Sequence, residues 1–553
     1  MSGIKVNHLM GRGEFSAQNV ERFTLPSRSV QSVMREYLTD AGELTIRKMI
    51  SQKLGYLCLK EFCSQHVPQM LVLFNFYDQI RAYEKLGSDE ARRPLARGIY
   101  QRFIMPELLS FPEAFTQSVI SEIQYCLHQH RYPQNLFQPL VSDICQALSR
   151  QTFNRFLNSK YFTRFCQWKN VQLSIHLGVD DFRIEAPMHR HSFGKNYKCQ
   201  KVDTGKIYRM KCYSKKYLKL KGAAGLALNE QKVLTILSEE DCPFIVQMTY
   251  TFQTDDMLYY ILDYTAGGDL QTLTKDNHLL ETEARFYTAE IILGLEHMHK
   301  HSIVYRDLKP SNILLNRSGH IRIADTHLAC DFSKTLPTAT VGSHGYVAPE
   351  VLEDGTAYNS SADWFSLGCL LYHLIEGHSP FYQKKSEENR KYGRRTVTTS
   401  LELPHNYTPE LVSLLNGLLD RVVNQRLGCS SKGALEVKSH QFFRKVIWHS
   451  LYMQEYVPPQ IPVREKLADS SLPTEDMESR RVSLVRSDEE LYWNFAVTMP
   501  ERWASEVVDT IFWDVNEAAD QAETAEALRP SDSDGLAGTE SDLWSLAGLL
   551  LGP

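Results

Sequence analysis

The sequence predicts a multidomain protein in which an all-α bundle precedes a larger bilobal α+β domain. From Ser29 to Trp168, long amphipathic runs with few glycines and isolated prolines favour a helix bundle. From Phe182 to Phe443, short β-rich runs give way to helical patterns, which is typical of an α+β domain. From Arg444 onward, regular patterning is poor and acidic residues are frequent, which indicates an extended tail.

Within the second region, two apolar runs are interpreted as edges of a nucleotide cleft. They are the β-rich runs Val233–Leu237 and Tyr259–Asp263, and Gly267-Gly268 marks a turn after the second. Further on, Ala289–His299 is predicted to be a buried helix that leads into the most informative stretch of the chain.

Composition excludes some classes of function. The 553 residues carry 61 Lys and Arg against 66 Asp and Glu, a formal charge of −5, so no global basic field draws the chain to nucleic acid. The basic run Lys215–Lys221 is interpreted as a solvated face rather than a lipid patch. The 11 cysteines form no C-x-x-C pair, and there is no signal peptide and no apolar run of about 18 residues. A cytoplasmic protein with free thiols and only peripheral membrane association is therefore expected.

The stretch from Tyr305 to Asn312 carries the groups that phosphoryl transfer to a hydroxyl requires. Asp307 is placed to accept or orient the hydroxyl proton, and Lys309 to offset charge on the transferring phosphoryl group. Asn312 and Asp325 are oxygen donors with the spacing of magnesium ligands. The sequence therefore predicts Asp307 and Lys309 as catalytic residues, with Mg²⁺ held by Asn312 and Asp325.

Residues in the same order and spacing as in protein kinases surround this stretch. Lys211 ends a short strand as the lysine of the ATP α- and β-phosphates does, and Glu230 lies about one helix downstream to pair with it. Val347–Glu350 is interpreted as the anchor of the activation segment, with Arg426 as a buried partner for its glutamate, and Asp363–Gly368 completes the series. Together these elements predict a protein kinase fold that uses ATP.

The predicted nucleotide site has further members. Phe193 and Gly194 belong to the loop that would cover the phosphates, and Asp263 and Asp269 flank the Gly-Gly turn at the cleft edge. With Lys211 they make up the predicted ATP-binding set.

Several further motifs resemble those of the G-protein-coupled receptor kinases, especially the β-adrenergic receptor kinase branch. They are Tyr305 in place of the catalytic-loop histidine, Val341–Glu350, Ala329–Ser333, Ser51–Tyr56 and Phe162–Lys169. The resemblance, which extends from about Ser29 to Glu517, implies a regulator-of-G-protein-signalling homology bundle that braces a serine/threonine kinase of the AGC type. Such a kinase would phosphorylate activated receptors and so promote desensitisation. Ser487–Phe495 resembles the tail segment that crosses the nucleotide cleft in this group.

These observations divide the chain into five parts. They are an N-terminal extension at 1–28, the homology bundle at 29–181, the kinase domain at 182–443, the AGC tail at 444–516 and an acidic, disordered C-terminus at 517–553. The chain is expected to stop before the pleckstrin-homology domain that binds Gβγ and anionic lipid in the β-adrenergic branch.

Several positions depart from the kinase pattern where ATP should bind. His189 and His191 replace two of three glycines that let bare backbone approach the phosphates. Arg209 stands where a small alanine packs against adenine, and Asn196 replaces an apolar valine. Asp325-Thr326-His327 replaces the Asp-Leu-Gly of this branch. Two hypotheses remain: an active receptor kinase that tolerates these changes, and a catalytically impaired kinase-fold scaffold that binds receptor or G-protein subunits.

The resemblance also implies partners. Activated receptors are the expected substrates, and Arg97, Met105 and Leu109 match a bundle face that binds Gα of the q class, with Gln101 in place of the usual acidic residue. Met1–Phe15 does not keep the apolar face of the family's receptor-docking helix. Recruitment to the plasma membrane is therefore expected to depend on partners.

Overall fold

The computed structural model describes residues 24–86, 89–105, 115–191, 194–275, 278–381, 396, 403–460 and 483–527. Two units are present, one spanning Pro26–Thr510 and a smaller one to which the described residues 24–25 and 511–527 belong. The smaller unit contains helix α24 (Phe512–Ala527). This helix includes residues 517–527 of the predicted disordered C-terminus, in which the acidic, alanine-rich stretch Glu517–Glu526 is expected to be partly helical because alanine and glutamate favour helix. The rest of that prediction, 528–553, lies outside the described residues.

The first region of the larger unit is helical, as the amphipathic pattern predicts. Its elements are α2 (Val30–Asp40), α3 (Ile46–Ser51), α4 (Lys53–His66), η1 (Pro68–Met70), α5 (Leu71–Glu84), α6 (Asp89–Ile99), η2 (Tyr100–Ile104), α8 (Gln117–His128), α9 (Gln138–Leu148), η3 (Ser149–Phe153), α10 (Asn154–Phe156) and α11 (Lys160–Leu173). Ser159 begins α11 by accepting a hydrogen bond from the amide of Phe162, which with Trp168 is buried in the bundle.

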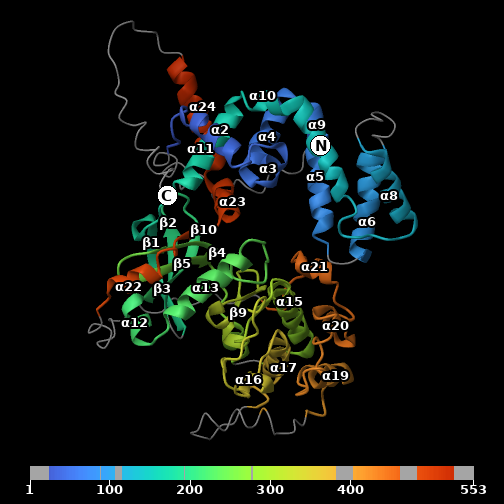
Figure 1. Cartoon of the computed structure of the whole chain (residues 1–553). Helices are drawn as coiled ribbons and strands as arrows, with labels where there is room; N and C mark the ends of the chain where they lie inside the picture. Colours follow the sequence, from blue (N-terminus) through green and yellow to red (C-terminus); the bar gives the residue numbers. More distant parts are fainter. Residues whose placement is uncertain are drawn as a thin grey trace. The chain divides into compact units, whose positions relative to one another are not determined.

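A six-stranded antiparallel sheet forms the smaller kinase lobe (Figure 1). Its strands are β1 (Phe182–His191, after η4 at Val179–Asp181), β2 (Gly194–Lys201), β3 (Ile207–Ser214), β4 (Met248–Gln253), β5 (Met257–Asp263) and β10 (Val497–Thr498), in the order β1-β2-β3-β5-β4-β10. Helices α12 (Lys215–Leu220) and α13 (Ala224–Leu237) follow β3. Val233–Leu237, interpreted from sequence as β-rich, is the end of α13, because Val233, Leu234 and Leu237 are buried on one face of that helix.

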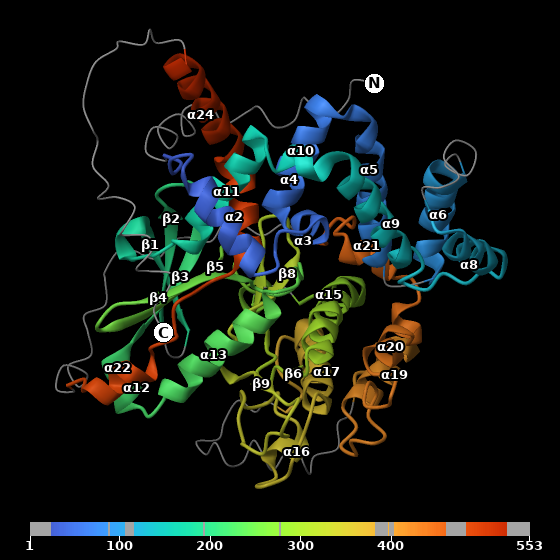
Figure 2. The same ribbon diagram turned by 45° about the horizontal axis from the view of Figure 1, so that its top comes forward.

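The larger kinase lobe is mainly helical. Its helices are α14 (Leu270–Thr274), α15 (Glu281–Lys300), α16 (Pro349–Leu352), α17 (Ser361–Glu376), α19 (Pro409–Leu418), α20 (Ala434–Lys438), η7 (Gln441–Phe443) and α21 (Trp448–Tyr452). Strand β6 (Ile303–Val304) pairs with β9 (Cys330–Asp331), and β7 (Ile313–Leu315) pairs with β8 (Ile321–Ile323). Along the chain, the short helix η5 (Pro310–Asn312) lies between β6 and β7, and η6 (Thr326–Leu328) lies between β8 and β9. Helix α15, which contains the predicted buried helix Ala289–His299, lies beside α17 (Figure 2).

The tail returns to the small lobe instead of remaining extended. It forms α22 (Arg486–Leu491), β10 and α23 (Pro500–Thr510), and Val497 of β10 pairs with Thr251 of β4. Tyr492 and Phe495 are buried in the small-lobe core. Removing their apolar surface from water stabilises the tail in this position. The described part of the segment that was predicted to cross the nucleotide cleft thus lies along β4 and α12 instead.

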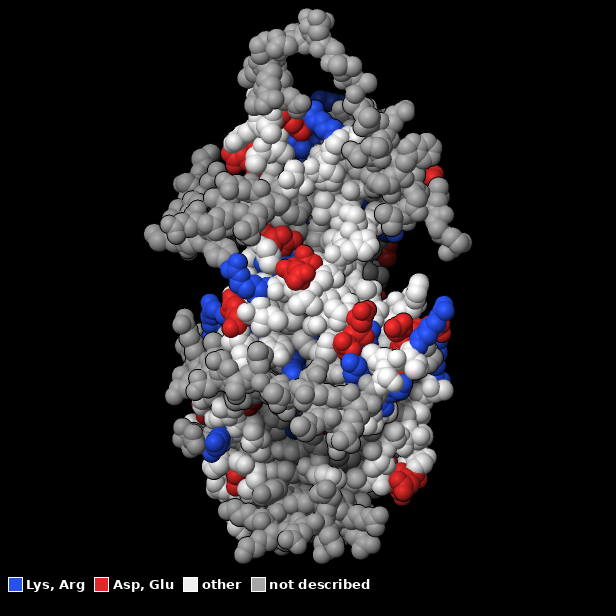
Figure 3. Space-filling view, turned by 90° about the vertical axis from the view of Figure 1, so that its left-hand side faces the viewer, with Lys and Arg blue, Asp and Glu red and all other residues white. Residues whose placement is uncertain are grey.

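The basic run after β3 is engaged within the molecule. Lys215 is buried with its ammonium nitrogen 5.3 Å from the Tyr492 ring, and Lys219 pairs with Asp488 of α22 at 2.7 Å. These lysines hold the tail, which argues against a lipid patch and corrects the expectation of a fully solvated face. On the face drawn in Figure 3, acidic and basic side chains of the described residues are interspersed. None of the described helices combines the length and the apolar character that a membrane span needs.

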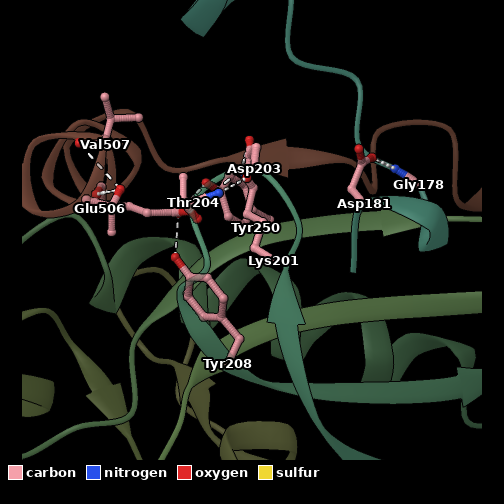
Figure 4. A network of polar contacts seen from close by, with 10 residues as sticks. Gly178, Asp181, Lys201, Asp203, Thr204, Tyr208, Tyr250, Glu506 and Val507 are labelled. Atoms are coloured by element: carbon pink, nitrogen blue, oxygen red, sulfur yellow. Dashed lines mark hydrogen bonds and ion pairs between the residues drawn. The ribbon is translucent and has the colours of Figure 1, made fainter. Parts of the chain in front are cut away.

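A buried carboxylate fixes α23 to the sheet (Figure 4). The side chain of Glu506 is fully buried and accepts hydrogen bonds from the hydroxyls of Thr204, Tyr208 and Tyr250. The ammonium group of Lys201 lies 3.6 Å from the same carboxylate. Burial and the neighbouring negative charge raise the pKa of both tyrosines well above the usual range, so they remain donors.

Helix α23 also contacts the helix bundle. The rings of Trp503 and Trp168 lie 6.3 Å apart, and the side-chain amide of Gln172 donates to the carbonyl of Pro500 at 3.1 Å. The amide of Lys53 donates to the carboxylate of Glu501 at 3.4 Å. Helix α23 therefore joins the bundle to the kinase sheet.

Substitution Glu506→Gln tests this junction. The amide cannot accept all three hydroxyl donors as the carboxylate does and leaves Lys201 without a buried counter-charge, so we expect a loss of about 1–3 kcal/mol in unfolding free energy. Urea denaturation followed by tryptophan fluorescence measures the change. The exposed Glu36→Gln is the control, and an equal, negligible effect of both substitutions would contradict the assignment.

Acid sensitivity is expected from His373 on α17. Burial, with smaller contributions from His378 and His278, lowers the pKa of His373 to about 4, and its Nδ1 lies 2.7 Å from the hydroxyl of Tyr346. Between about pH 6.5 and pH 4, His373 is protonated in the unfolded chain but neutral in the folded chain. The free energy of unfolding therefore falls as the pH drops from about 6.5 toward about 4. The contribution is about 2 kcal/mol at pH 5.

We therefore expect the stability difference between wild type and His373→Gln to shift in favour of the variant by about 2 kcal/mol from pH 7.5 to pH 5. Urea titrations at both pH values measure it, with exposed His128→Gln as control. A difference that does not change with pH would contradict this account.

Candidate active site

A buried ion-pair cluster connects β3, α13 and the residues after β8. The ammonium nitrogen of Lys211 lies 2.8 Å from Oε1 of Glu230 and 3.1 Å from Oδ1 of Asp325. The hydroxyl of Tyr213 donates to the other oxygen of Glu230 at 2.7 Å. Burial by itself lowers the pKa of Lys211, but Asp325 and Glu230 outweigh it and raise the pKa above the usual value. The structure thus brings the predicted residues Lys211, Glu230 and Asp325 together, with the lysine charged.

The catalytic-loop side chains form a second cluster. The amide of Asn312 donates to Oδ2 of Asp307 at 2.7 Å, and the ammonium nitrogen of Lys309 lies 3.1 Å from that oxygen. The hydroxyl of Ser343 donates to Oδ1 of Asp307 at 2.6 Å and accepts from Lys309 at 2.7 Å. Asp307, Lys309 and Asn312 therefore meet as predicted. Ser343 lies in the family-like stretch Val341–Glu350, but the sequence alone predicts no role for it.

One buried carboxylate on α17 orients the loop. Asp363 is fully buried and accepts from the backbone amides of Tyr305 and Arg306 at 2.8 and 2.9 Å, and its Oδ2 lies 2.8 Å from Nε2 of His299. Arg306 has a φ of 69°, a conformation that the two amide bonds help to hold. The hydroxyl of Tyr305 donates to the carbonyl of Ala324, which links the loop to the residues that carry Asp325.

The activation segment has the predicted anchor. Arg426 is buried, and its two terminal nitrogens donate to the two carboxylate oxygens of Glu350 at 2.5 and 2.9 Å. This bidentate geometry is favourable because a buried charge needs a partner for each of its polar atoms. The predicted partnership of Arg426 with Glu350 is confirmed.

Arg209 lies beside the ion-pair cluster of Lys211, Glu230 and Asp325. Its side chain is 2% exposed, its Nε donates to Oδ1 of Asn196 at 3.0 Å, and its NH2 lies 3.7 Å from Oδ1 of Asp325. Within the described residues, NH2 of Arg209 and Nδ2 of Asn196 make no hydrogen bond. Two polar side chains thus occupy a region predicted to contact adenine, and a guanidinium group shares a carboxylate oxygen predicted to bind magnesium.

The residues after Asp325 change its support. Asp325 has a φ of 53°, and Thr326, in a spine position expected to be apolar, is 2% exposed with no partner for its hydroxyl among the described residues. Burial lowers the pKa of His327, so the imidazole is neutral near pH 7. A buried, unsatisfied hydroxyl costs about 1–3 kcal/mol, and that cost falls on the segment that positions Asp325.

The loop over the phosphates is described only in part. Phe193 lies outside the described residues, as do the side chains of His189 and His191. At Gly194, an added Cβ would lie 3.1 Å from both the carbonyl oxygen of Cys212 and the ring of Tyr213. Close packing against β3 therefore favours glycine at this position, independently of any nucleotide.

Two other predicted nucleotide residues have structural partners. The carboxylate oxygens of Asp263 accept from Arg322 at 2.5 Å and from Arg502 of α23 at 2.7 Å. These guanidinium groups outweigh the effect of burial and lower the pKa of Asp263. Asp269 begins α14 by accepting from the amide of Thr272 at 2.7 Å. The contacts argue against side-chain roles in ATP binding for Asp263 and Asp269, because local charge pairing and helix capping explain both.

Comparison with known families agrees with these two regions. Residues 186–443 match the protein kinase domain model, and residues 45–165 match the regulator of G protein signaling domain model. The first match spans both lobes around the clusters described above, and the second spans most of the helix bundle.

Curated relatives match almost the whole chain. Beta-adrenergic receptor kinase 1 of Didelphis virginiana is 50% identical over 515 residues, which cover 92% of this chain and 74% of the relative. The Homo sapiens protein of the same name is 49% identical over the same shares. G protein-coupled receptor kinase 2 of Caenorhabditis elegans is 44% identical over 530 residues, 94% of this chain and 75% of the relative.

Proposed function

This chain belongs to the family of G-protein-coupled receptor kinases, and from that premise we propose that it transfers the γ-phosphate of ATP to serine or threonine hydroxyls of activated receptors, promoting their desensitisation. It is a serine/threonine protein kinase by family. The observation that carries the proposal is the cluster around Asp307, in which a buried carboxylate is held by Asn312, Lys309 and Ser343.

The residues present fit the substrates of such a reaction. Asp307 would accept the proton of the substrate hydroxyl, Lys309 would offset charge on the transferring group, and Lys211 would contact the α- and β-phosphates. Asn312 and Asp325 offer oxygen atoms, which Mg²⁺ prefers, and bound Mg²⁺ supplies charge neutralisation on the phosphates. The hydrogen bond between Asn312 and Asp307 holds a predicted magnesium ligand next to the predicted proton acceptor.

A second candidate function is favoured by Arg209. Its guanidinium group lies against Asp325 and its side chain fills space where a small residue would leave room for adenine. A kinase-fold scaffold that binds receptor or G-protein subunits without efficient transfer is consistent with that arrangement. The relatives' names describe kinases, which favours the first function.

Partners and location follow from the family and the surface. We propose cytoplasmic residence, recruitment to the plasma membrane by activated receptors, and binding of Gα through the bundle. Arg97, Gln101 and Met105 are exposed on α6 and the residues after it, which leaves them accessible to a partner. Leu109 and Met1–Phe15 lie outside the described residues.

Substitution Arg209→Ala separates the two functions. Removing the guanidinium group takes one of two neighbouring cations away from Asp325, which still pairs with Lys211, and opens space for the base. We therefore expect at least about tenfold tighter Mg²⁺-dependent ATP binding, about 1.4 kcal/mol. Titration calorimetry measures binding, and phosphate transfer to an agonist-occupied receptor measures activity. The matched control is Arg322→Ala, which removes a guanidinium group from Asp263 outside the cluster.

The kinase proposal requires transfer by the wild-type chain and its loss in Asp307→Asn with ATP binding retained. If wild type transfers no phosphate while Arg209→Ala does, the wild-type chain is a scaffold and the kinase proposal fails. If neither chain binds ATP with Mg²⁺, Arg209 is not the obstacle.

A further inference from the structure

A group of potential metal ligands lies outside the active site, where α13 and α15 end. Glu240 lies in the turn between α13 and β4, His297 lies in the last turn of α15, and His301 caps that helix. The histidines are four residues apart, so their side chains project from the same face of the helix end. One ligand atom of each of the three residues lies within 4.8 Å of the others.

The histidines are oriented for coordination. Nδ1 of His301 lies 2.9 Å from the carbonyl oxygen of His297 and donates to it, which assigns the tautomer and leaves the Nε2 lone pair free. That Nε2 is 3.8 Å from Oε2 of Glu240. Nε2 of His297 is buried and has no hydrogen-bond partner within the described part of the chain. A shielded imidazole nitrogen without a partner is unfavourable unless a ligand is bound.

We propose that Glu240, His297 and His301 bind a zinc ion, with water as the fourth ligand. Two imidazole nitrogens and one carboxylate match the donor set of three-ligand zinc sites and are too nitrogen-rich for Mg²⁺ or Ca²⁺. In a tetrahedral site with bonds of about 2.0–2.2 Å, donors are about 3.3 Å apart, so the cluster must contract slightly.

Rotation of the Glu240 side chain can bring the three ligand atoms closer together. The side chain is 56% exposed. Among the described residues, its one ion-pair partner besides His301 is the exposed Lys300, whose ammonium nitrogen lies 3.5 Å from Oε2. Rotation of this side chain would break one solvent-screened pair and bring the carboxylate to the histidines. The carboxylate of the adjacent Asp241 is 88% exposed and lies 3.5 Å from NH1 of Arg502, so its charge is already paired.

A zinc ion here would connect two elements that position the active site. Glu240 follows α13, which carries Glu230, and His301 precedes β6 and the catalytic loop. The coordination bonds would restrain the end of α13 against the end of α15. The site is independent of whether phosphate is transferred.

Zinc binding is tested on the full chain after chelator treatment, by competition with a fluorescent zinc indicator. We expect one saturable site with micromolar or tighter affinity, weakened at least tenfold in Glu240→Gln and in His301→Gln. The side chain of Glu240 is 56% exposed and that of His301 is 19% exposed, so neither is a core side chain, and circular dichroism verifies that the fold is retained. The matched control is His176→Gln, since Nδ1 of His176 also contacts a backbone carbonyl, that of Ser174 at 2.8 Å, but lies outside the cluster.

Because the chain has 11 cysteines, the ligand type must also be measured. X-ray absorption of the one-to-one complex should show nitrogen and oxygen neighbours with imidazole scattering and no sulfur. Absence of saturable binding, sulfur ligation, or unchanged affinity in both cluster variants would overturn the proposal.

Discussion

The charge balance of one buried cluster decides what the cleft can bind. Lys211 and Arg209 supply two positive charges, and Glu230 and Asp325 supply two negative charges, within ion-pair distance of one another. With a neutral residue in place of Arg209, the cluster would carry a net negative charge that a magnesium ion could offset. With Arg209 present the cluster is balanced without a metal, so Mg²⁺ must displace a buried cation or enter a neutral site. The arrangement of β3, α13 and the loop after β8 is stable by itself for the same reason.

Helix α23 extends this dependence to the helix bundle. Glu506 ties it to the sheet through three hydroxyls, and Arg502 ties it to Asp263 at the end of β5, while Trp503 packs against Trp168 of the bundle. Buried charged groups need fixed partners, so α23 has few alternative positions on the sheet. The bundle therefore contacts the kinase sheet through a tail helix. Displacement of the bundle would move α23 and so disturb the pairing of Arg502 with Asp263 at the end of β5.

The sequence predicts the reactive residues and the helical region more fully than it predicts contacts between residues that are distant in the chain. Lys211 and Glu230 were identified because phosphoryl transfer requires those groups in that order, and the bundle because helical periodicity is long-range and regular. Val233–Leu237 was misassigned because a short run of four apolar residues and one threonine suits a strand and a buried helix end equally. The pairing of Asp263 with Arg502 could not be predicted because the two residues are distant in sequence. The contacts of Ser343 depend on how the activation segment folds back.

The intact catalytic residues do not by themselves distinguish a kinase from a scaffold. A buried lysine that loses its carboxylate costs about 3–5 kcal/mol, so Lys211 and Glu230 are needed for folding whether or not phosphate is transferred. Asp307 is likewise held by bonds that order its loop. Arg209 and Asn196 differ, because their hydrogen bond satisfies only part of each group and leaves two buried nitrogens unbonded among the described residues. A ligand that binds here must either accept hydrogen bonds from those nitrogens or displace their side chains. That requirement restricts the choice of ligand more than the catalytic loop does.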